Sequence, residues 1–187
     1  MSKQNNTLVF MVVFILGTIL GVLGTISSPV EANLSYFWPA ETIEATAGIL
    51  FGFWGAIAAT LFPLLSNLLT AEYPSYHVIG LIPSCVIQSF IPLLIKKIMR
   101  FDPGELSIKT ICSYSIGCVL LPNIIAGSLG CYILYLLDDC STIDSYFNAL
   151  YTWLIGNIPC ALIFGLFILK TLTPILKSCN LYYEGFF

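Results

Sequence analysis

The chain has 187 residues, of which 58% are hydrophobic and 9% charged, and its mean hydropathy is +0.92. A soluble domain of this size carries about 25% charged residues, so the composition excludes an ordinary soluble domain. The net charge is −3 and the sequence contains no basic patch, so we expect no nucleic-acid partner. We expect residues 1–187 to form a single polytopic membrane domain, an all-α integral membrane protein.

Six apolar runs predict six transmembrane helices, because runs of about 18 apolar residues are candidates for spanning a bilayer. The first run, Leu8–Ile26, follows a polar start and is interpreted as a retained helix. A secretory signal is the alternative, since Val30-Glu31-Ala32 loosely resembles a cleavage site. The other runs are Pro39–Phe53, Trp54–Thr70, His77–Ile95, Ser107–Leu137 and Tyr146–Leu169.

The second and third helices are separated only by Gly52, within the sequence FGFWG. One helix from Pro39 to Thr70 would be roughly 48 Å long, which is too long for a hydrocarbon core of ~30 Å. We therefore expect two short helices that meet at this glycine.

The distribution of charge supports six crossings with both termini cytoplasmic, in a multi-pass protein of the cell membrane. Basic residues concentrate in cytoplasmic segments of membrane proteins. With this topology all seven basic residues lie inside: Lys3, Lys96, Lys97, Arg100, Lys109, Lys170 and Lys177. Seven of the ten acids then lie at the outer side: Glu31, Glu41, Glu44, Glu72, Asp138, Asp139 and Asp144.

The sequence carries no motif for enzymatic chemistry. It lacks a P-loop, a zinc-protease motif and a nucleophile elbow, and His77 is the single histidine. The seven cysteines have no C-x-x-C spacing, and five lie in apolar runs, where cysteine behaves as a small hydrophobe. We expect no enzyme activity, no cofactor, no metal site and no disulfide framework.

Small residues recur on the first helix at Gly17, Gly21 and Gly24. This spacing lets another helix approach closely, because packing drives helix association in lipid. Two interpretations stay open: contact with a helix of the same chain, or a docking face for a separate membrane partner.

Polar side chains lie near the predicted centres of helices four, five and six. They are Gln88, Asn123 and Asn157, and Trp153 shares a helix face with Asn157. A proline precedes Asn123 directly and another follows Asn157 by two residues, and each frees a backbone carbonyl. Two interpretations remain: hydrogen bonds between helices, worth ~0.6 kcal/mol on average, or a polar cavity open to the outside.

Two acids, Glu41 and Glu44, begin the second helix on one face, since they are three residues apart. The positive end of the helix accounts for Glu41, which we expect at the entrance of a pocket. Glu44 lies about one turn deeper, where an ionisable group needs a polar interior. Tyr36 and Trp38 are interfacial anchors by default, or a lid over that interior.

The architecture resembles the S component of energy-coupling factor (ECF) transporters: six helices, both termini inside and a sizeable outer loop, Ser27–Trp38. The resemblance implies a subunit that captures a micronutrient from outside, with that loop as a gate. It also implies that the small residues of helix one dock onto a membrane coupling subunit driven by ATPases. The substrate-binding candidates are then Glu41, Glu44, Gln88, Asn123, Trp153 and Asn157.

A second resemblance is local. The stretch FWPAETIEATAGILFGFWGAIAATLFPLLSNLLT is similar to the opening of the MASE1 membrane sensor domain, and WLIGNIPCALIF is similar to a later W-x-x-G-[DN] element of that domain. It implies a sensory module, here without its own output domain. The main expectation is therefore solute capture, with small-molecule solute and lipid bilayer as partners, and the alternative is sensing.

Overall fold

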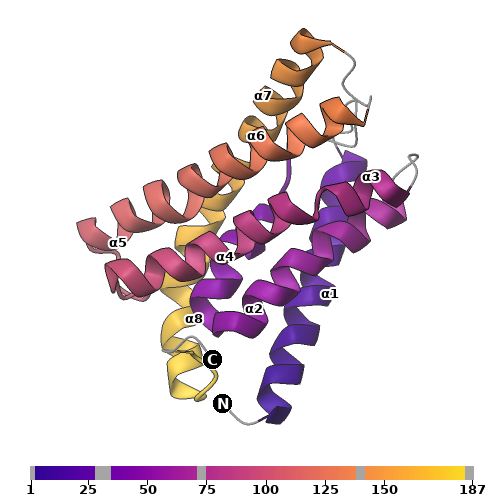
Figure 1. The fold of residues 1–187 in the computed structure, drawn as a ribbon. Coiled ribbons are helices and arrows are strands. Elements are labelled where there is room, and N and C mark those ends of the chain that lie inside the picture. Colours follow the sequence, from indigo (N-terminus) through magenta and orange to yellow (C-terminus); the bar gives the residue numbers. More distant parts are fainter. Residues whose placement is uncertain (1–2, 28–34, 71–74, 138–141, 184–187) are drawn as a thin grey trace.

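The computed structural model describes residues 3–27, 35–70, 75–137 and 142–183, and every regular element in these ranges is a helix. The first four helices are α1 (Lys3–Ser27), α2 (Glu41–Thr70), α3 (Ser75–Gly80) and α4 (Ile82–Met99). Next, α5 (Ile108–Cys112), the π-helical segment η2 (Ser113–Leu120) and α6 (Leu121–Leu136) form one continuous rod. A second rod consists of α7 (Ile143–Cys160), the π-helical segment η3 (Ala161–Gly165) and α8 (Leu166–Ser178) (Figure 1).

Five helical stretches within the described residues are long and apolar enough to cross a membrane. They are Asn5–Ser27, Glu41–Thr70, Ile82–Met99, Ile108–Leu136 and Ile143–Ser178. Large apolar side chains are exposed along these stretches, for example Leu16 on α1 and Ile163 on η3, and exposed apolar surface of this extent suits lipid rather than water. The architecture agrees with the predicted class, an all-α membrane protein.

The chain reverses direction inside α2, at Gly52. Gly52 has φ 65° and ψ −144°, a conformation that residues with a Cβ rarely adopt. A Cβ built on Gly55 would overlap the backbone oxygen of Ala47, yet a continuous helix separates residues eight apart by about 12 Å. The segments 41–51 and 53–70 therefore form a tight hairpin, and the predicted break at Gly52 is found; its two crossings remain a prediction.

Two boundaries differ from the predicted runs. The run His77–Ile95 is divided at Leu81 between the short α3 and α4, because Pro83 occupies the first turn of α4, where its missing N–H costs nothing. The last rod continues to Ser178 rather than ending at Leu169. Its final turns are amphipathic, so a window based on hydropathy ends too early.

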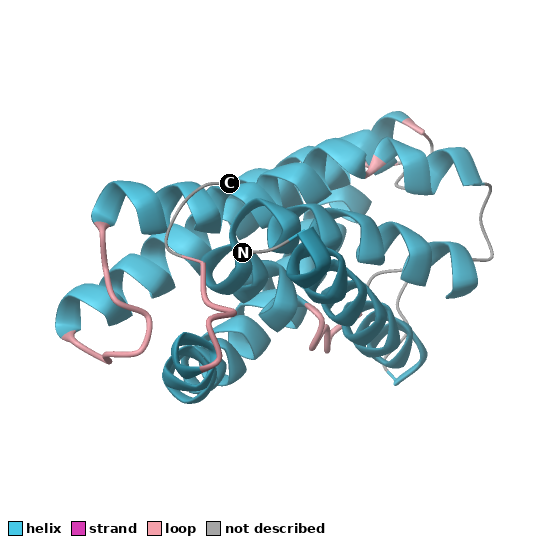
Figure 2. Cartoon of the chain, turned by 90° about the horizontal axis from the view of Figure 1, so that it is seen from below, coloured by secondary structure: helices cyan, strands magenta, loops and turns pink. Residues whose placement is uncertain are grey.

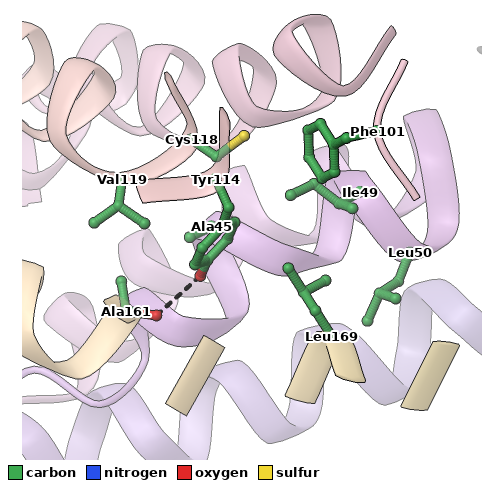
Figure 3. Packing of buried hydrophobic residues seen from close by; sticks show 9 residues of the cluster. All are labelled: Ala45, Ile49, Leu50, Phe101, Tyr114, Cys118, Val119, Ala161 and Leu169. Carbon is green, nitrogen blue, oxygen red and sulfur yellow. Dashed lines mark hydrogen bonds between the residues drawn. The ribbon is translucent and has the colours of Figure 1, made fainter. Parts of the chain in front are cut away.

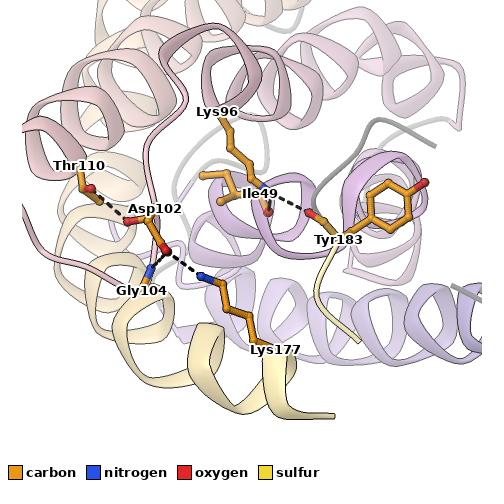
Figure 4. Close-up of polar contacts among 7 residues, drawn as sticks. All are labelled: Ile49, Lys96, Asp102, Gly104, Thr110, Lys177 and Tyr183. Carbon is orange, nitrogen blue, oxygen red and sulfur yellow. Dashed lines mark hydrogen bonds and ion pairs between the residues drawn. The ribbon is translucent and has the colours of Figure 1, made fainter. Parts of the chain in front are cut away.

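The start of α1 and the end of α8 lie at the same end of the bundle (Figure 1), and Figure 2 shows this end from below. The hairpin turn at Gly52 lies there too, because the backbone N–H of Tyr183 donates to Leu50 O at 3.1 Å. Lys96, in the last turn of α4, donates from Nζ to Ile49 O and Tyr183 O, each at 2.8 Å (Figure 4). Lys177 pairs with Asp102 at the same end, at 2.7 Å. We call this region the basic end.

The segment 41–51 is the centre of the fold. Ala45, Ile49 and Leu50 are fully enclosed, between η2 on one side and η3 and α8 on the other (Figure 3). Tyr114 of η2 crosses this core and donates its hydroxyl to Ala161 O at 2.9 Å. A helix buried on all sides has other helices as its whole environment, so polar groups at its start are placed inside the bundle.

Candidate functional site

A buried polar cluster joins three helices at the middle of the bundle: Glu41 of α2, Gln88 of α4 and Asn123 of α6. Their exposed fractions are 0%, 1% and 0%. Gln88 Nε2 donates to Glu41 Oε2 and also to Asn123 Oδ1, the latter at 3.0 Å. Asn123 Nδ2 donates to Glu41 Oε1 at 2.8 Å. Each residue thus bonds the other two, in a closed triangle that we call the polar cluster.

The triangle fixes the orientation of the Gln88 amide. Its Nε2 faces two acceptors, so exchanging the amide nitrogen and oxygen would set an oxygen against two other oxygens. Gln88 Oε1 must therefore face away from the triangle, and it is buried without a hydrogen-bond partner within the described part of the chain. A buried acceptor left in this state costs about 1–3 kcal/mol, so the cluster holds an unused acceptor.

Glu44 extends the cluster by one helical turn towards Trp38. It is 4% exposed, and it accepts the indole N–H of Trp38 at 3.2 Å. The backbone N–H of Trp38 donates in turn to Gly156 O of α7 at 3.1 Å. A Cβ on Gly156 would overlap Ser35 O, so the absence of a side chain there lets the segment 35–40 lie against α7.

The sequence analysis expects Glu41 at a pocket entrance, and in the structure its side chain is fully buried. The segment 41–51 is about 16 Å long at 1.5 Å per residue, so it starts about halfway through a ~30 Å core if the Gly52 turn lies at the membrane surface. The residues before it, 35–40, are not helical. Tyr36 and Phe37 are about half exposed, and the backbone of Trp38 is bonded to α7.

Two π-helical segments adjoin the prolines of the long rods. η2 ends at Leu120, two residues before Pro122, and η3 begins two residues after Pro159. The N–H of Leu121 bonds Ile116 O, five residues back, so the helix widens next to a residue that lacks an N–H. This local change sets the direction in which Asn123 enters the bundle, and π-segments often mark functional sites.

Trp153 and Asn157 are near the cluster but not in it. Trp153 packs on the α6 glycines, since a Cβ on Gly130 would lie 3.2 Å from its ring and 3.1 Å from Ser84 Oγ. The Trp153 Nε1 and Ser84 Oγ atoms are buried and have no hydrogen-bond partner among the described residues. Asn157 is 7% exposed, and its side chain makes no hydrogen bond to the triangle.

Ser84 is a residue that the sequence analysis missed. It is four residues before Gln88 on α4, so both lie on one helix face, and this spacing was the available signal. The lid role of Trp38 stays a prediction. The residue is partly buried, and its indole N–H bonds Glu44.

The three glycines of α1 contact helix α2 and the segment before it. Added Cβ atoms would meet Phe62 at Gly17, Ser66 at Gly21, and Phe37 O at Gly24. The structure thus gives this face contacts within the chain, which agrees with the first of the two interpretations, and docking of a partner stays a prediction. The predicted gate, Ser27–Trp38, falls partly on residues 28–34, which are outside the described residues. Four of the predicted outer acids are also outside the described residues: Glu31, Glu72, Asp138 and Asp139.

No family model, curated protein or solved structure matches this chain. The site therefore has to be interpreted from its own geometry.

Proposed function

We propose that this protein is a membrane-embedded solute-capture subunit of an uptake transporter, with the polar cluster as its binding site. The proposal rests on one observation: a buried carboxylate, held by two amides in the interior of an apolar bundle, with an unused acceptor beside it. Ionisable groups in membrane interiors are costly and mark functional positions by default.

Structural cohesion alone does not account for this arrangement. An interhelical hydrogen bond in a membrane contributes about 0.6 kcal/mol on average, whereas a buried carboxylate costs several kcal/mol to remove from water. Apolar side chains would join α2, α4 and α6 at lower cost. A solute that completes the cluster offsets this cost and accounts for its retention.

The hairpin in α2 supports the same proposal. Transporters commonly bind solutes near the bilayer midplane, at the ends of discontinuous helices. The segment 41–51 is such a short helix, and its first turn carries Glu41 and Glu44. The chain has no ATP-binding motif, so accumulation against a gradient needs partners, a membrane coupling subunit and ATPases.

The test is native mass spectrometry of the protein purified in mild detergent. We expect a bound small molecule in the wild type, lost in Gln88→Leu. The control is Asn148→Leu, an amide-to-leucine substitution at an exposed position of α7. Solute that stays bound in Gln88→Leu, or is absent from the wild type, would contradict the proposal.

Orientation is proposed with the basic end cytoplasmic and with six crossings. Cys179, an exposed thiol at the end of α8, reports on this end. With Cys140 replaced by serine, a membrane-impermeant maleimide should label Cys179 only after cells are permeabilised. Labelling in intact cells would show that the orientation is the opposite one.

A second candidate function, a MASE1-like sensory module, is favoured by a specific contact. The two stretches similar to that domain meet in space, because the Trp38 N–H donates to Gly156 O. Affinity purification distinguishes the two proposals: ATPases and a second membrane protein support transport, and a kinase or cyclase supports sensing.

A further inference from the structure

We infer that the solute held by the polar cluster is a small organic cation with N–H donors, an ammonium or an amidinium. This inference rests on the proposed function and names the class of solute. It follows from the charge of the cluster, from its free hydrogen-bonding groups and from the helix end on which it is built.

The charge argument concerns the donors on the two carboxylates. Glu41 accepts from the side-chain amides of Gln88 and Asn123, and Glu44 accepts from the indole of Trp38. In the described part of the chain, no basic side chain hydrogen-bonds either one. Lys96 and Lys177 are held at the basic end, by carbonyls and by Asp102. The cluster thus has two acidic groups and only neutral donors, and a bound cation supplies the missing partner.

The hydrogen-bonding argument concerns what the cluster leaves unused. Gln88 Oε1 is a pure acceptor, and it is buried with no partner in the described residues. Ser84 Oγ, one turn earlier on the same face of α4, is in the same state at 0% exposure. An N–H donor satisfies the amide oxygen, whereas a carboxylate or phosphate oxygen would be repelled by it.

The helix argument concerns the N-terminus of α2, where an anion would usually bind. The N-terminus of a short buried helix carries partial positive charge and attracts anions. In α2 the first turn already contains Glu41 and Glu44, and either one, when ionised, offsets the partial positive charge of the helix end. A cation is attracted where an anion would otherwise bind.

A metal ion fits the cluster less well than an organic cation. Hard cations such as Ca²⁺ take six or more oxygen ligands, and among the described side-chain oxygens of this region only Gln88 Oε1 and Ser84 Oγ are buried without a hydrogen-bond partner. No group of three or more His, Cys, Asp or Glu side chains is found in the described ranges. A metal ion is therefore treated as an outcome that would overturn the inference.

The experiment is a binding screen on the full chain in nanodiscs at pH 7. Alkyl, aryl and heteroaryl ammonium and amidinium compounds are each paired with a neutral isostere, such as benzylamine with benzyl alcohol and benzamidine with benzamide. Benzoate, NaCl and CaCl₂ complete the set. A rise in Tm identifies ligands, and titration calorimetry measures Kd.

We expect ligands only among the organic cations. Their affinity should fall at least ten-fold in Glu44→Gln, which keeps an oxygen for the Trp38 N–H and is verified as folded by its Tm. Asp144→Asn, which removes one exposed acid at the start of α7, is the matched control and should bind as the wild type does.

Three results would overturn the inference: ligands that are neutral, anionic or metal ions; cation binding that Glu44→Gln leaves unchanged; or no ligand in the whole set. The proposed function has a separate readout, the molecule that co-purifies. A co-purified neutral or anionic molecule that Gln88→Leu releases would contradict the cation inference and leave solute capture standing. A wild type that binds no molecule in either experiment would sink both.

Discussion

The polar cluster and the basic end place carboxylates in opposite situations. Asp102 at the basic end pairs with Lys177 at 2.7 Å, and the two side chains are 41% and 39% exposed. Glu41 in the cluster is 0% exposed and is held only by neutral amides. Asp102 is partly exposed, so it loses little hydration, and it has a cationic partner. Glu41 is fully buried, so it loses its hydration, and it has no cationic partner among the described residues.

This difference predicts unequal energetics in the two regions. Exposed ion pairs contribute about 0–1 kcal/mol, so single changes to the exposed pair at the basic end should cost little. A buried carboxylate without a cation is costly to remove from water, so loss of one of its hydrogen-bond donors should cost more.

The largest effect is expected for Asn123→Leu. Asn123 donates to Glu41 and accepts from Gln88, so leucine leaves a buried carboxylate with one donor fewer and an amide with one acceptor fewer. We expect the free energy of unfolding to fall by about 3 kcal/mol, measured by SDS titration in detergent. Asn148→Leu, at an exposed site, controls for the substitution. A loss near the ~0.6 kcal/mol of an ordinary membrane hydrogen bond would remove the energetic contrast between the two regions.

The next effect tests how the basic end supports the central helix. Gly52→Ala introduces a Cβ at φ 65°, 2.5 Å from the ring of Tyr183. We expect a loss of about 2 kcal/mol from the backbone conformation, with more from the clash. The double variant Gly52→Ala, Tyr183→Ala separates the two causes, because it relieves the clash and keeps the strain. Full recovery in the double variant would show that the backbone conformation is not the constraint.

The helices were largely predictable from the sequence, since apolar runs report burial in lipid directly. Gln88, Asn123 and Glu41 were also identifiable, because polar residues in such runs are rare. Their meeting in one triangle was not, because it depends on how three helices are rotated about their axes.

The full burial of Glu41 was not predictable from the sequence. Hydropathy marks where apolar residues begin, and it does not show which neighbouring helices cover that point. The glycines of α1 show a related limit, because close packing within a chain and docking between chains require the same small residues.

Lys96 joins the C-terminal segment to the Gly52 turn within the basic end, and Lys96→Met should have a smaller effect. Its ammonium donates to Ile49 O and Tyr183 O and lies 4.4 Å from the centre of the Tyr182 ring. We expect a loss of about 1.5 kcal/mol, the value of a hydrogen bond to a charged group, measured by the same titration. Lys170→Met, at an exposed position of α8, is the control. If the two variants behave alike, Lys96 does not hold the chain end over the Gly52 turn.

The smallest effect is expected for the exposed pair, and it depends on pH. Partial burial raises the pKa of Asp102, but hydrogen bonds from Lys177 and from the Gly104 N–H outweigh this and hold it below its usual value (Figure 4). A lowered folded-state pKa stabilises the fold above the unfolded pKa of about 3.9, and the stabilisation is lost as pH falls through the folded value. Asp102→Asn should therefore cost about 0.5 kcal/mol at pH 7 and nothing at the acid end of a pH series of unfolding measurements. A cost that persists there would mean that the Asp102 side chain stabilises the fold through packing rather than through its charge. The basic end would then depend on packed contacts, as the polar cluster does.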